Sequence, residues 1–227
     1  MAETGNGAPQ DAMLTVPLEM ESARVLADQA AIISDLQFVM DCCKRLLDEL
    51  DKPEGQRDSV VPHALWSAAL VAYARCFGRN KRSGLTTEDV YGLPLQGAVM
   101  KYHRWVLKER GKLAVHQANP FDVAKVGAAL SPPGSAKRRI EGIAVLSASH
   151  VLVNDIGVRQ LGGLASELAK QTAEKVKTQQ DAVLADAREL SLDGLYQLPP
   201  MQPYLPDGGG APDSEIPESS APEGQPG

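Results

Sequence analysis

The segment from Leu18 to Leu50 constrains the fold most strongly, because its apolar residues recur with the period of an α-helix. They form two series with seven-residue spacing, and further apolar residues between the series widen the stripe. A helix with so wide an apolar face is stable only when other helices cover it, so this segment predicts a helical bundle. Pro53 and Gly55 predict where the helix ends. The stripe consists of Val25, Leu26, Ile32, Ile33, Leu36, Val39, Met40, Cys43, Leu46, Leu47 and Leu50.

Further along the chain, three segments carry helical patterns and two carry strand patterns. Helices are predicted over Pro62–Phe77, Leu95–Leu113 and Val158–Leu190, each with an apolar face. Strands are predicted over Val123–Leu130 and Ile140–Leu146, and the Pro- and Gly-rich turn between them predicts a hairpin at about residues 123–147. The predicted fold is therefore mainly α: an antiparallel helical bundle with an inserted β-hairpin.

The two ends of the chain differ in composition from its body. Residues 1–17 and 199–227 offer little apolar surface to offset their chain entropy, so both are predicted to be disordered tails, and residues 18–198 to form one helical domain. The formal net charge of the chain is −6, of which residues 199–227 carry −5 and residues 1–18 carry −2. Residues 19–198 therefore carry +1, and the acidic total does not exclude a nucleic-acid partner.

Several classes of protein are excluded by what the sequence lacks. It has no run of 18 or more apolar residues, and its first residues lack the cationic and apolar segments of a secretory signal, so no membrane association is predicted. Three cysteines, two of them adjacent, cannot form a disulfide framework, and a cytoplasmic location is predicted. The cysteines and histidines lack metal-ligand spacing and there is no glycine-rich phosphate loop, so neither a metal nor a cofactor is predicted.

The predicted helix over Leu95–Leu113 carries an unusual concentration of positive charge. Between Lys101 and Lys112 the local charge is +4. Four of the cations recur at helical spacing and therefore lie on one face. Such a row can contact the phosphates of RNA, although a solvated helix face is the common reading of a charge run. The four predicted phosphate-binding residues are Lys101, Arg104, Lys108 and Lys112.

Arg110 and His116 follow this row and offer the side-chain chemistry of metal-independent RNA cleavage. An imidazole titrates in the range where it can take the proton of a 2′-hydroxyl group. A guanidinium can stabilise the charge that develops on the phosphate. The product of that reaction would carry a 2′,3′-cyclic phosphate. On a straight helix, positions six apart lie about 120° from each other, so a long arginine side chain or a helix end near Gly111 has to bring the groups together.

The segment Arg110-Gly-Lys-Leu-Ala-Val-His116 resembles the Arg-(four to six residues)-His motif of the HEPN superfamily (higher eukaryotes and prokaryotes nucleotide-binding). The segment Ala64-Leu-Trp-Ser-Ala-Ala-Leu-Val-Ala-Tyr-Ala-Arg-Cys-Phe77 is similar to the second helix of HEPN proteins of the abortive-infection type. The resemblance implies a HEPN-like domain over residues 18–198 and a homodimer that brings two motifs into one cleft. It further implies a metal-independent endoribonuclease of a toxin–antitoxin or phage-defence system, with RNA as substrate and an antitoxin or other partner protein. In that reading, Arg110 binds the scissile phosphate and His116 is the general acid and base.

Alternatives remain open on the sequence alone. Gly111 stands where the family usually has Asn, Asp or His, and Gln117 stands where a Ser is common. A catalytically inactive helical dimer that binds RNA, a nucleotide or a partner protein is therefore the alternative function. An adaptor whose acidic tail recruits a partner is a third. His103 is interpreted as a packing or solvent-facing residue, and Trp66 and Trp105 as core or dimer-interface residues.

Overall fold

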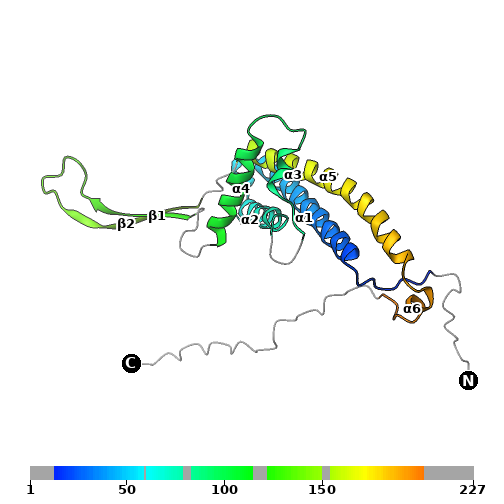
Figure 1. Ribbon diagram of the computed structural model, residues 1–227. Coiled ribbons are helices and arrows are strands. Elements are labelled where there is room, and N and C mark those ends of the chain that lie inside the picture. Colours follow the sequence, from blue (N-terminus) through cyan, green and yellow to red (C-terminus); the bar gives the residue numbers. More distant parts are fainter. Residues whose placement is uncertain (1–12, 59, 79–82, 115–121, 150–153, 202–227) are drawn as a thin grey trace, which may run out of the picture. The chain divides into compact units, whose positions relative to one another are not determined.

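The computed structural model describes residues 13–58, 60–78, 83–114, 122–149 and 154–201. The chain divides into a large compact unit, residues 19–189, and a small one formed by residues 1–18 and 190–227. The described residues are mainly helical with one antiparallel hairpin, which confirms the predicted fold class (Figure 1). The disorder predicted for residues 1–12 and 202–227 lies outside the described residues.

The large unit contains the four long helices that the apolar pattern predicts. Their bounds are α1 (Glu21–Leu50), α2 (Val60–Arg75), α4 (Val99–Ala114) and α5 (Asp155–Arg188), and a short 3₁₀ turn, η1 (Glu54–Gln56), follows α1. The helix predicted from Leu95 begins only at Val99, because Gly97 has φ +90°, which interrupts a right-handed helix. The last helix begins three residues earlier than Val158, because the side chain of Asn154 accepts a hydrogen bond from the Gly157 N–H. No helix in the described ranges has the length and apolarity needed to cross a membrane.

α5 packs on α1 in the antiparallel direction. The amide of Gln179, late in α5, donates to the carbonyl of Ser22, early in α1, whereas Gly162, early in α5, lies against Cys43. Figure 1 shows α5 running alongside α1. On the other side of α1, the guanidinium of Arg75 binds the carboxylate of Asp35 at 2.5 Å and ties α2 to it. α4 packs on α2, which completes the bundle.

Most of the predicted apolar stripe of α1 lies in the core or packs against it, whereas Val25, Leu26 and Ile33 lie outside the buried cluster. Side chains from α1, α2, α4 and α5 form one buried cluster, in which the largest fully buried side chains include Trp66 and Tyr73. Small residues of α2 face the neighbouring helices and permit their close approach. The core of α1 consists of Ile32, Leu36, Val39, Cys42, Cys43 and Leu46.

The three cysteines provide a test of this core. Cys42, Cys43 and Cys76 are buried, and burial raises the pKa of the Cys43 thiol to about 12 and that of the Cys42 thiol above its usual value. We expect no thiol of the native chain to react with Ellman's reagent at pH 8, because only an accessible thiolate reacts. Titration in urea should release all three. Rapid reaction of any thiol in the folded chain would contradict this packing.

A short helix, α3 (Thr87–Tyr91), lies within the stretch that the sequence patterns leave without structure. Thr86 and Asp89 form a capping box, in which the Asp89 carboxylate accepts hydrogen bonds from the Thr86 N–H and hydroxyl groups. The same carboxylate forms an ion pair with Lys175 of α5. These contacts hold α3 to the bundle beside the beginning of α4.

The hairpin pairs β1 (Asp122–Leu130) with β2 (Ile140–Ser149), close to the predicted strands. Val126 lies opposite Val145 and Ala128 opposite Ile143, so these side chains share one apolar face. A β-bulge shifts the register between Ala129 and Leu130. The large apolar side chains of the hairpin are 65–72% exposed, and none of its described residues belongs to the helical core.

The small unit is described over residues 13–18 and 190–201. It contains α6 (Leu192–Tyr196), which the side chain of Ser191 caps by accepting a hydrogen bond from the Gly194 N–H. The Met201 N–H donates to the carbonyl of Thr15 at 2.7 Å, so the two segments of this unit contact each other directly.

Candidate nucleic-acid interface

The predicted cation row lies along an exposed face of α4. Lys101, Arg104, Lys108 and Lys112 are all exposed there, whereas Val106 on the other side of the helix is fully buried. Lys112 forms an ion pair with the buried carboxylate of Glu109 at 2.7 Å, so part of its charge is neutralised. The other three cations form no ion pair with any residue that the structure describes. We refer to Lys101, Arg104 and Lys108 as the α4 cation face.

Arg110 lies in the last turn of α4 and is exposed. It too forms no ion pair among the described residues. A Cβ atom at the following Gly111 would meet no heavy atom within 4 Å. α4 ends at Ala114, and His116 lies outside the described residues. The structure thus places the predicted arginine on the surface in the last turn of α4, four residues before the described helix ends.

His103 shares its side of α4 with Arg110 by helical spacing but is part of the core. Its imidazole is 3% exposed, and its Nδ1 atom lies 2.8 Å from the hydroxyl oxygen of Tyr73. The rings of Tyr73 and Phe77 lie beside it, with centroids 5.8 and 4.7 Å away. Burial, and then the positive charge of Arg104, lower the pKa of His103, so the imidazole is neutral at pH 7. A buried neutral histidine cannot reach a bound RNA strand, and the packing interpretation of His103 is confirmed.

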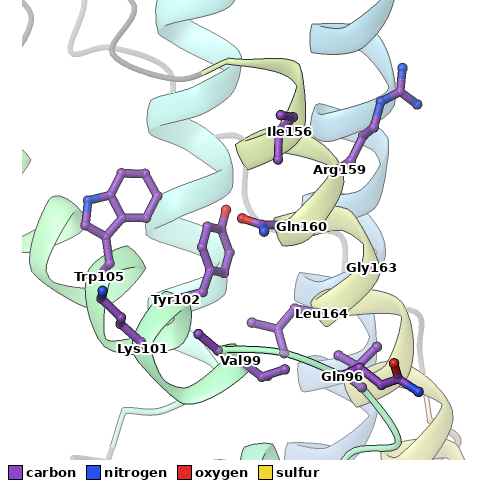
Figure 2. Close-up of a pocket in the computed structure, with 12 residues that line it drawn as sticks. Gln96, Val99, Lys101, Tyr102, Trp105, Ile156, Arg159, Gln160, Gly163 and Leu164 are labelled. Atoms are coloured by element: carbon purple, nitrogen blue, oxygen red, sulfur yellow. The ribbon is translucent and has the colours of Figure 1, made fainter.

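A cavity of about 640 Å³ lies between the beginnings of α4 and α5 (Figure 2). Its wall on α4 is aromatic, since the rings of Tyr102 and Trp105 lie 5.4 Å apart, and Trp105 packs in turn on the buried Trp66. The Tyr102 hydroxyl donates to the carbonyl of Gly157 at 2.6 Å and joins the two helices. The lining residues are Leu95, Gln96, Ala98, Val99, Lys101, Tyr102, Trp105, Ile156, Arg159, Gln160, Gly163 and Leu164.

The sequence patterns missed this cavity. Its residues come from the turn before α4, from α4 and from α5, and no local motif connects them. The signal in the sequence was the aromatic pair Tyr102 and Trp105, each of which directly follows a residue of the cation row. Such a pair is equally typical of a helix core. Trp66 is fully buried as predicted, whereas Trp105 is half-buried and lines the cavity.

Comparison of the chain with models of known protein families, with curated proteins and with solved structures finds no match. Among the residues described here, no group of three or more His, Cys, Asp or Glu side chains is arranged to hold a metal ion. What this site can bind therefore follows from its own side chains.

Proposed function

We propose that this chain is a cytoplasmic, metal-independent endoribonuclease of the HEPN type, acting as a homodimer in toxin–antitoxin or phage defence. The α4 cation face would bind the RNA backbone, and Arg110 and His116 would act on one phosphodiester. The observation that carries the proposal is the run of exposed cations without ion pairs, Lys101, Arg104, Lys108 and Arg110, which leads into the segment with His116. Unpaired cations in a row favour phosphates because binding releases counterions from the nucleic acid.

The proposed reaction needs only groups of this chain and the RNA. The imidazole of His116 removes the proton from a 2′-hydroxyl group, and the 2′-oxygen attacks the adjacent phosphorus. The bond between phosphorus and the 5′-oxygen breaks, and the imidazolium of His116 returns the proton to the leaving oxygen. The guanidinium of Arg110 stabilises the charge on the phosphate oxygens during this step. The products are a 2′,3′-cyclic phosphate and a 5′-hydroxyl end.

A catalytically inactive homodimer that binds RNA is the second candidate. Gly111 favours it, because the residue after Arg110 offers no polar side chain to orient the imidazole of His116. Incubation of the chain with single-stranded RNA in EDTA separates the two functions. Appearance of 2′,3′-cyclic phosphate ends supports the nuclease, binding without cleavage supports the second candidate, and neither binding nor cleavage refutes both.

The binding step predicts a change in salt dependence. We expect Arg104→Ala combined with Lys108→Ala to weaken single-stranded RNA binding roughly tenfold and to lower the slope of log K against log salt by about 1.4, because two phosphate contacts are lost. Fluorescence anisotropy over a salt series measures both quantities. The matched control is Lys170→Ala with Lys177→Ala, which removes two exposed cations of α5 that are paired with Glu167 and Glu174. Equal losses in the two double variants would contradict a specific role for α4.

A further inference from the structure

We propose that the cavity between α4 and α5 binds one unstacked nucleotide, with its base against the aromatic wall and its phosphate at Lys101. We infer that this nucleotide is part of the RNA strand, and this part of the inference rests on the proposed function. Free nucleoside monophosphates offer the same chemistry. Arg110 is not among the residues that line the cavity.

The size and composition of the cavity fit a nucleotide. Its volume of about 640 Å³ lies within the range of small-molecule sites, roughly 300–1,000 Å³. Two half-buried aromatic side chains, Tyr102 and Trp105, give a base a surface on which to stack. Val99, Leu164 and Ile156 supply apolar contacts around them (Figure 2). The cavity is thus apolar where a base would lie.

The polar groups of the lining also fit a base joined to a phosphate. The carboxamides of Gln96 and Gln160 each combine a hydrogen-bond donor and an acceptor, which matches the mixed edge of a nucleobase. Figure 2 shows Gln160 on α5 directed toward Tyr102. The lining side chains include two cations, Lys101 and Arg159, and no carboxylate. These positive charges favour a ligand with an acidic group over an uncharged apolar ligand.

The cavity is continuous with the α4 cation face, because Lys101 belongs to both. Arg159 of α5 lies on the opposite side of the cavity and is directed away from the aromatic wall (Figure 2), so the phosphate is assigned to Lys101 alone. A strand held along α4 can therefore turn one base into the cavity only if that base is unpaired, which makes single-stranded RNA the preferred class over duplex.

Gly163 allows the cavity to be filled without disturbing the bundle. A Cβ atom at this lining residue of α5 would meet no heavy atom within 4 Å. Gly163→Leu should occupy the cavity, whereas Gly163→Ala makes the same change in helix propensity with little added volume. Lys101→Ala provides a second variant, which removes the phosphate contact and leaves the aromatic wall intact. The probes are uridine 5′-monophosphate, a single-stranded oligouridylate and an RNA duplex, measured by anisotropy and by the fluorescence of Trp105.

We expect Gly163→Leu to weaken binding of the monophosphate and of the single strand at least about tenfold, the size expected for one lost stacking contact, and to leave duplex binding unchanged. Lys101→Ala should also weaken binding of the monophosphate and of the single strand. If RNA binds but Gly163→Leu equals Gly163→Ala, the cavity proposal is overturned while the proposed function stands. If RNA does not bind but the monophosphate does, and Gly163→Leu abolishes this, the cavity proposal stands and the proposed function falls. Binding of neither probe overturns both.

Discussion

We expect His116→Ala to reduce RNA cleavage in EDTA by at least about a hundredfold, because a general base contributes roughly 10²–10⁴ to such a proton transfer. Arg110→Ala should cause a loss of similar size, since it removes the cation that stabilises charge on the phosphate. Arg110→Lys should recover only part of the rate, because an ammonium group lacks the planar fork of a guanidinium. Quantification of 2′,3′-cyclic phosphate ends under single-turnover conditions measures all three effects.

The controls separate catalysis from folding and from binding. His63, a half-buried residue of α2, provides the matched histidine, and His63→Gln should cleave at the wild-type rate. The thermal melt of His116→Ala should equal that of the unsubstituted chain. RNA affinity should also be retained in this variant, because the α4 cation face is intact. An unchanged cleavage rate in His116→Ala would remove the nuclease assignment altogether.

The long helices could be predicted because their information is local and repeated. The apolar stripe of α1 recurs over about seven turns, so errors at single positions do not change the result. The helix ends are harder to predict, because each is set by a single residue. These residues are Gly97, at φ +90°, before α4 and the capping residue Asn154 before α5. α3 is only five residues long and has no periodicity, although the spacing of Thr86 and Asp89 is the signature of a capping box.

The candidate site likewise has one part that the sequence predicts and one part that it does not. The α4 cation face is specified within one helix, so spacing alone predicts that its members share a face. Spacing also puts His103 on the same side as Arg110, yet one is buried and the other exposed, because the rings of Tyr73 and Phe77 lie beside His103 near the beginning of α4, whereas Arg110 lies in its last turn. The cavity joins Trp105 of α4 to Arg159 of α5, and their proximity follows from tertiary packing rather than from any motif.

His103 carries the second large prediction, which concerns stability. Replacing it with Ala removes a buried ring and leaves the Tyr73 hydroxyl without its 2.8 Å partner, at a cost of about 3–5 kcal/mol in the free energy of unfolding. Tyr73→Phe should cost less, about 1–3 kcal/mol, because the ring remains. Urea denaturation of both single variants and the double variant measures their coupling, and strictly additive losses would contradict a direct interaction.

The same histidine should make stability depend on pH. Because burial and Arg104 lower its pKa in the folded chain, the unfolded chain binds a proton more readily. The contribution of neutral His103 is therefore complete above the unfolded pKa of about 6.5 and is lost as the pH falls below it. In His103→Gln, the difference in unfolding free energy between pH 7.5 and pH 5 should shrink. If this variant keeps the full difference, the loss of stability at low pH comes from other groups and not from His103.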